Sequence, residues 1–130
     1  MPDIVNNGSD EMFASDPFAL STLQKRSDFL LAARAKRHHS KSFVLQMRAR
    51  RDDDPTIRVG FTCSKKVGNA VARNRAKRRL REIARQILPM QGTQGMDYVL
   101  IGRRDVTAAT PMQDMEAELT IALKTLGRAK

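Results

Sequence analysis

Lysine and arginine side chains gather in one stretch of the chain, Ser64–Arg85, which holds nine cations against a single acid, Glu82. Guanidinium groups present planar, bidentate donors that match the oxygens of phosphate. Because so many like charges repel one another, a bound polyanion would relieve the repulsion and release its own counterions. A solvated surface helix is the alternative, but such helices usually mix both signs of charge. The chemistry indicated is therefore phosphate binding.

The same stretch has the periodicity of an amphipathic helix. Apolar side chains recur at spacings of three and four between Ala72 and Leu88, which keeps them on one helix face. Pro89 is expected to end this helix. Arg79 is expected to flank the apolar face, and Arg73 to lie at the helix start, because a regular helix would point it inward. The opposite face carries the polar set Asn74, Arg75, Arg78, Arg81 and Arg85.

Composition places the chain among small basic proteins. It has 130 residues, 41% of them hydrophobic, a formal net charge of +10 and a pI near 10.6, which suits one domain that binds nucleic acid or an anionic surface. No apolar run reaches the ~20 residues of a membrane-spanning helix, and no export signal is evident. The one cysteine, Cys63, lies in an apolar strand pattern and is expected to be a packed thiol in the cytoplasm.

The remaining elements alternate helix and strand patterns. A first helix is expected from Ser27 to Lys36, with Leu30 and Leu31 toward the core and Phe29 at the flank of that face, followed by a polar loop that contains His38 and His39. Strands are expected over residues 42–50, 56–63 and 97–103, the last one central in a sheet, and a helix over 110–127. Residues 1–17 are expected to form an acidic, disordered extension, 18–127 the folded domain and 128–130 a basic tail.

The order of residues in the basic stretch is more specific than its charge. Lys65-Lys66-x-Gly68-Asn69, then Arg73-Asn74-Arg75, then Lys77-Arg78 and Arg81 resembles the signature of the bacterial ribonuclease P protein subunit. The resemblance extends from about Leu23 to Leu126. It implies a single-domain α+β fold like the second domain of ribosomal protein S5. That fold has a small central sheet of about four strands, about three helices and a left-handed β-α-β crossover.

The resemblance also implies partners and roles. The expected partners are a catalytic ribonuclease P RNA and precursor tRNA, with no membrane and no obligate protein partner. The chemistry, removal of the 5′ leader, would be carried by the RNA with Mg²⁺ and by no catalytic residue of this chain. Phe29, Gln46 and Arg81 would line a cleft for the leader, although Ala33 and Gln46 stand where the family often has aromatics. The residues expected to bind the RNA subunit are Lys65, Lys66, Arg73, Asn74, Arg75, Lys77, Arg78 and Arg79.

Three other classes of function fit the sequence less well. A ribosomal protein or RNA chaperone would share the charge and size, but the ordered basic motif favours ribonuclease P. An autonomous metal-dependent nuclease would need acids such as Asp97, Asp105 and Asp114 to converge, and their spacing does not indicate that they do. A double-stranded DNA binder would be expected to show a helix-turn-helix or zinc pattern, and neither is present.

Overall fold

Helix α3 (Ala70–Gln91) is the longest element of the computed structural model, which describes residues 20–128. Its buried side chains repeat at helical spacing, as predicted: Ala76, Leu80, Ile83, Ala84 and Leu88. Pro89 does not end the helix, which continues for two more residues. A proline in the last turn removes only one N–H donor, and the N–H of Gly92 still donates to the carbonyl of Leu88 at 2.8 Å.

Five strands form one mixed sheet in the order β2-β5-β6-β4-β3. Their bounds are β2 (Leu20–Thr22), β3 (Lys36–His39), β4 (Phe43–Ala49), β5 (Ile57–Thr62) and β6 (Met96–Gly102). β6 lies at the centre, as predicted, parallel to β5 and antiparallel to β4. The parallel pair β5 and β6 is joined through α3, which confirms the predicted β-α-β unit. With α2, α4 and α5 completing the fold, the single-domain α+β class is also confirmed.

The sheet has one strand more than the roughly four that the resemblance implied, and two of its strands, β2 and β3, were not predicted from the residues. β3 lies where a polar loop was predicted. Its sequence, Lys-Arg-His-His, has no β-branched or aliphatic residue and so gives no strand signal. The segment is extended because it pairs antiparallel with β4 at the edge of the sheet. Charged side chains are common on such edges, where they discourage pairing with other chains.

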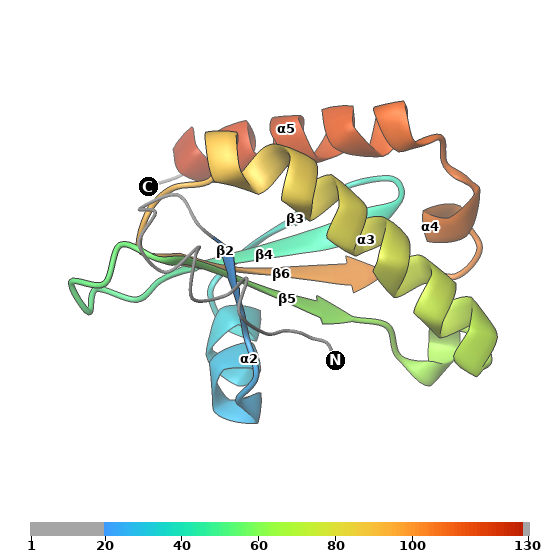
Figure 1. Ribbon diagram of the computed structural model, residues 1–130, viewed down its shortest axis with the longest axis horizontal. Helices are drawn as coiled ribbons and strands as arrows, with labels where there is room; N and C mark the ends of the chain where they lie inside the picture. Colours follow the sequence, from blue (N-terminus) through green and yellow to red (C-terminus); the bar gives the residue numbers. More distant parts are fainter. Residues whose placement is uncertain (1–19, 129–130) are drawn as a thin grey trace.

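The two faces of the sheet are covered differently (Figure 1). One face, here called the α3 face, is covered by α3 and by α5 (Met112–Arg128). The other, the α2 face, is covered by the short helix α2 (Arg26–Ala33). On the α3 face lies the main apolar core, to which β4, β5 and β6 contribute alternate residues, including Leu45, Val59 and Leu100. Cys63 is buried in this core as predicted, and burial raises the pKa of its thiol.

Helix α2 shows the largest difference from the predicted packing. It begins at Arg26, with Lys25 rather than Ser27 as its N-cap, and it ends at Ala33. Leu30 and Leu31 are exposed, whereas Ala32 is buried and Phe29 packs beside it against Leu23 and Val99. The prediction of Leu30 and Leu31 as core residues was wrong. Residues 29–33 of this helix are all apolar and point in every direction around its axis. Periodicity therefore could not select the face that meets the sheet.

The C-terminal helix carries the predicted apolar stripe, which includes Met115, Leu119 and Leu123. Helix α5 continues through Gly127 to Arg128, so Gly127 does not end it. A short helix, α4 (Val106–Ala109), precedes it. The predicted acidic extension, residues 1–17, lies outside the described residues, as do the last two residues of the predicted basic tail.

Candidate nucleic-acid interface

The basic stretch begins with a turn that has strict backbone requirements. Lys65–Val67 forms the short 3₁₀ helix η1, and Gly68 follows with φ = 147°, a conformation that side chains with a Cβ rarely adopt. The side chain of Asn69 then caps α3 by accepting a hydrogen bond from the N–H of Ala72 at 2.9 Å. The glycine and the asparagine of the motif therefore set the angle between η1 and α3.

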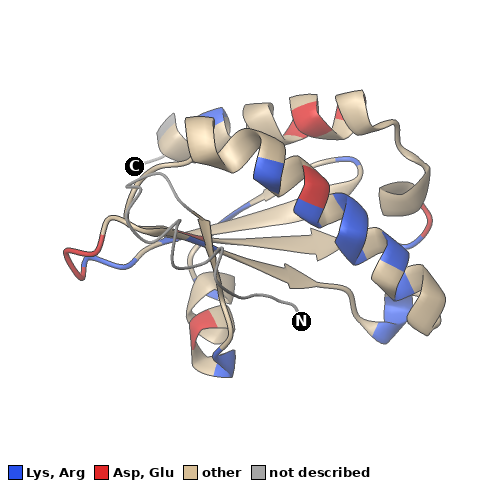
Figure 2. Cartoon of the chain, viewed as in Figure 1, with Lys and Arg blue, Asp and Glu red and all other residues tan. Residues whose placement is uncertain are grey.

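Exposed cations extend from η1 along the solvent side of α3 (Figure 2). Among the residues predicted to bind the RNA subunit, five are exposed: Lys65, Lys66, Asn74, Arg75 and Arg78. Arg81 and Arg85 continue the same side of the helix, where Glu82 pairs with Arg85 at 3.7 Å. We call these exposed residues of η1 and α3 the basic surface. The acids of the loop between β4 and β5 lie at the other end of the sheet, away from the basic surface.

Arg79 differs from its neighbours because its guanidinium is used inside the protein. Its Nε donates to the carbonyl of Thr107 at 2.9 Å, and one terminal nitrogen donates to the carbonyl of Thr110 and contacts the sulfur of Met115. These bonds fix α4 and the start of α5 against α3. No sequence pattern indicates this role, because the acceptors are backbone groups about thirty residues away.

Arg73 and Lys77 are half-buried and lie between the basic surface and the core. Arg73 is the fourth residue of α3, close to the helix start as predicted, and its N–H donates to the carbonyl of the N-cap residue Asn69 at 2.9 Å. Its Nε is buried and has no hydrogen-bond partner among residues 20–128. Its terminal nitrogens are thus the atoms of Arg73 best placed to meet a ligand outside the protein.

The three residues predicted to line a leader cleft lie on two faces of the sheet. Phe29 and Gln46 are on the α2 face, where Gln46 is buried opposite Val99. Arg81 belongs to α3 and lies over the ring of Phe61, 5.8 Å from its centroid, on the α3 face. Phe61 is a partly exposed aromatic of β5. β2 pairs with β5 only as far as Val59, so the rest of β5 lies between Phe29 and Gln46 on the α2 face and Arg81 on the α3 face.

Phe29 occupies a space that only glycine leaves open. A Cβ at Gly60 of β5 would lie 2.5 Å from Cε1 and 2.6 Å from Cζ of the Phe29 ring. The ring therefore rests directly on the backbone of β5, half-buried, with Leu23 beside it. Phe29 was predicted at the flank of the core-facing side of α2, whereas its ring contacts β5.

A second group of cations collects at one edge of the sheet. β3, β5 and β6 run in the same direction, so their carboxyl ends meet at that edge. Lys41 follows β3, and Lys65 and Lys66 follow β5. Arg103 and Arg104 follow β6, and a terminal nitrogen of Arg103 lies 3.4 Å from Nδ1 of His39. Arg103 and Arg104 were not predicted as site residues, although cations after the two predicted strands β5 and β6 were a usable signal.

The acids required by a metal-dependent nuclease are not brought together. Asp97 is fully buried and bonded to arginines. Among residues 20–128 no group of three His, Cys, Asp or Glu side chains is placed to hold a metal ion. No helix in the described part of the chain is long and apolar enough to cross a membrane.

These features define a small basic α+β protein with a one-sided cation surface suited to a polyanion. Residues 19–127 match the family model of ribonuclease P. The ribonuclease P protein component of Ruegeria pomeroyi is 57% identical over 112 residues, which cover 85% of this chain and 90% of that protein. That of Caulobacter vibrioides is 59% identical over 81 residues, 62% of this chain and 54% of that protein. The chain therefore belongs to the ribonuclease P protein family.

Solved structures agree with this assignment. The ribonuclease P protein of Thermotoga maritima is 30% identical and superposes with a TM-score of 0.64, over 81% of this chain and 96% of that one. The ribonuclease P protein of Staphylococcus aureus is 26% identical with a TM-score of 0.62, over 81% of this chain and 94% of that one.

Proposed function

We propose that this chain binds the catalytic RNA of ribonuclease P through its basic surface and assists removal of the 5′ leader from precursor tRNA. The observation that carries the proposal is the row of exposed cations on η1 and α3, in a member of this family. Lys65, Lys66, Arg75 and Arg78 point to solvent, and Asn74 lies among them. Neutralising RNA phosphates with several such groups gives an affinity that falls steeply as salt rises.

Arg79 is not assigned the contact with the RNA subunit that its position in the motif predicted. Because its donors already bond to Thr107 and Thr110, it supports the binding surface from inside rather than contacting phosphate. Arg73 and Lys77 remain candidates for contact through the ends of their side chains. Arg103 and Arg104 are added to the surface, because they lie at the same sheet edge as η1.

The leader is proposed to lie on the α2 face, where the half-exposed ring of Phe29 offers a flat surface for one base. Stacking on an aromatic ring tolerates any base sequence, which suits a leader of variable sequence. Gln46 is buried on the same face of the sheet, so it would contribute to the floor of this site. Arg81 lies on the α3 face, across the part of β5 that does not pair with β2. It would therefore meet a different part of the RNA than Phe29 does.

The metal required for hydrolysis does not fit the described residues of this chain. Asp97 is enclosed by arginines, while Asp52 and Asp54 accept hydrogen bonds from Arg50 and from backbone N–H groups. The proposal therefore assigns Mg²⁺ to the RNA subunit and assigns binding and orientation to the protein. The proposed enzyme is a ribonucleoprotein endoribonuclease. We expect it to act in the cytoplasm, together with its substrate, precursor tRNA.

The experiment is cleavage of a precursor tRNA by the cognate ribonuclease P RNA at low Mg²⁺, with and without this protein, and with protein alone as a control. We expect stimulation that requires the RNA. Cleavage by protein alone would overturn the proposal in favour of a nuclease. No stimulation, with tight binding to ribosomal RNA, would favour a ribosomal protein.

A pair of charge-matched variants locates the RNA surface. R75Q with R78Q removes two exposed cations from α3, whereas R51Q with K124Q removes two exposed cations elsewhere. We expect the first double variant to lower affinity for the RNA subunit and to reduce the slope of log affinity against log salt by about two, and the second to change both far less. Equal effects would mean that binding reports only total charge.

A further inference from the structure

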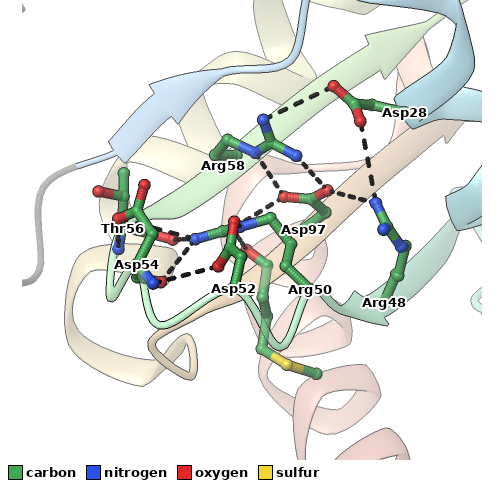
Figure 3. A network of polar contacts seen from close by, with 9 residues as sticks. Asp28, Arg48, Arg50, Asp52, Asp54, Thr56, Arg58 and Asp97 are labelled. Carbon is green, nitrogen blue, oxygen red and sulfur yellow. Dashed lines mark hydrogen bonds and ion pairs between the residues drawn. The ribbon is translucent and has the colours of Figure 1, made fainter.

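A buried carboxylate joins three strands on the α2 face. Asp97 of β6 is fully buried, and three arginines donate to it (Figure 3). Arg58 of β5 makes two bonds, at 2.7 and 2.8 Å, while Arg50 bonds at 2.9 Å and Arg48 of β4 at 3.3 Å. The hydrogen bonds to Asp97 raise the pKa of Arg58. A buried charge is tolerated when it is paired and hydrogen-bonded to this extent.

The three arginines have different surroundings. Arg50 has only 3% of its side chain exposed, and it also donates to the Asp52 carboxylate and to the carbonyls of Asp54, Thr56 and Met96. Its other bonds therefore hold the loop between β4 and β5. Arg48 and Arg58 are 23% and 27% exposed; Nη1 of Arg58 points to Asp28 rather than to Asp97, and Nη1 of Arg48 lies between the two carboxylates. These two are the members of the network that reach toward α2.

Asp28 of α2 closes the network from outside. Its carboxylate lies 3.9 Å from Arg48 and 3.6 Å from Arg58, so Asp28, Arg58, Asp97 and Arg48 form a ring of alternating charge (Figure 3). The distances to Asp28 are longer than those to Asp97. The sheet thus holds the arginines firmly, and α2 is attached to them by a looser ion pair.

Helix α2 has few other attachments. It has eight residues, no side-chain hydrogen bond at its N-cap, and two leucines exposed to solvent. Its buried contacts are Ala32 and Phe29, against Leu23 and Val99. Because Asp28 is adjacent to Phe29 in the chain, the ion pairs act next to the aromatic ring. The place of that ring over Gly60 therefore depends on how α2 is held.

We propose that Asp28, Arg48, Arg58 and Asp97 are positioning residues, which hold α2 on the sheet so that the ring of Phe29 is set for stacking on the precursor leader. This inference depends on the proposed function, because it assumes that the leader meets Phe29. The effect of the four residues reaches the substrate through the orientation of one aromatic ring.

The test measures leader preference, the ratio of the dissociation constants of the holoenzyme for mature tRNA and for precursor tRNA. We expect D28N and R48Q each to lower this ratio about three- to tenfold, a part of what one base stacked on an aromatic ring contributes. The two changes alter the charge of the protein in opposite directions. A simple electrostatic effect on RNA would move the ratio in opposite directions, whereas loss of positioning lowers it in both variants.

Two further variants separate positioning from general destabilisation. D28E keeps the carboxylate on a chain one methylene longer, which still reaches both arginines, and should preserve the ratio. In an F29A background, D28N should have no further effect, since the ring through which it acts is gone. D114N, which neutralises an exposed acid on α5, is the control for the charge change.

The outcomes distinguish this inference from the function on which it depends. If the wild-type protein does not stimulate cleavage, the proposed function fails and the inference fails with it. If it stimulates cleavage but D28N and R48Q keep the wild-type ratio, only the inference is overturned. An effect of D28N that persists undiminished in the F29A background would also overturn it, since Asp28 would then act by another route.

Discussion

The two faces of the sheet are stabilised by different physics. The α3 face is closed by two long amphipathic helices over a continuous apolar core that includes Leu45, Leu80 and Leu100. The α2 face is covered by eight helical residues, a small apolar cluster and a network of charges around Asp97. Apolar packing is tolerant of small shifts, whereas an ion network fixes particular atoms in particular places. Both faces stabilise the fold, and the second, whose ion network fixes particular atoms, is also suited to orienting a ligand.

The largest expected effect concerns the centre of the ionic face. D97N should lower the free energy of unfolding by about 3–5 kcal/mol, because three arginines would share a neutral amide instead of a carboxylate. L80A on the apolar face should cost about 3 kcal/mol through the cavity it leaves. Urea unfolding measures both. A loss below 1 kcal/mol for D97N would mean that the network contributes little to stability and that the contrast between the faces is wrong.

A smaller effect is expected to distinguish Arg75 from Arg79, two arginines of α3 that were both predicted to bind the RNA subunit. R79Q should lower the free energy of unfolding by about 1–3 kcal/mol, because the carbonyls of Thr107 and Thr110 lose their donor. R75Q should leave stability within about 0.5 kcal/mol and reduce the salt slope of RNA binding by about one. Thermal unfolding and salt-dependent binding, run on both variants, test the distinction. Identical profiles would contradict it.

A substitution at Gly60 would move the ring of Phe29 without changing any residue of α2. G60A places a methyl group where the ring now lies, so the ring must shift toward solvent. We expect leader preference to change severalfold while affinity for the RNA subunit stays within twofold, since stacking depends on ring position. A crystal structure of the variant would locate the ring. An unmoved ring, or an equal loss of RNA-subunit affinity, would contradict the prediction.

The smallest effect is expected in acid. A hydrogen bond from the N–H of Asp54 is the main cause that lowers the pKa of Asp52, and bonds from Thr56 lower the pKa of Asp54. Groups with lowered pKa values stabilise the folded loop between β4 and β5 above their ordinary value of 3.8 and lose that contribution as the pH falls through the lowered values. Amide exchange of this loop should therefore accelerate in strong acid before that of α3. Simultaneous acceleration would contradict this order.

Prediction from sequence succeeded where one periodic pattern had a single solution. The apolar residues of α3 repeat over several turns, so the buried face was correctly identified. The strands over Phe43–Ala49, Ile57–Thr62 and Met96–Gly102 were predicted to within two residues at each end. Helix α2 failed this test because its apolar residues surround it. β3 failed because a polar edge strand is extended only by the strand beside it.

The sequence by itself determined the basic surface and the family. The Lys-Lys-x-Gly-Asn motif fixes a capped helix start through Gly68 and Asn69. Arg75, Arg78 and Arg81 then face solvent when Leu80 and its neighbours face the core. Those are local constraints, so they can be read along the chain. Only the tertiary structure decided that Arg79 is an internal support and that Phe29 rests on Gly60. It also decided that Asp97 gathers arginines from other strands. These roles depend on partners distant in sequence, which no periodicity encodes.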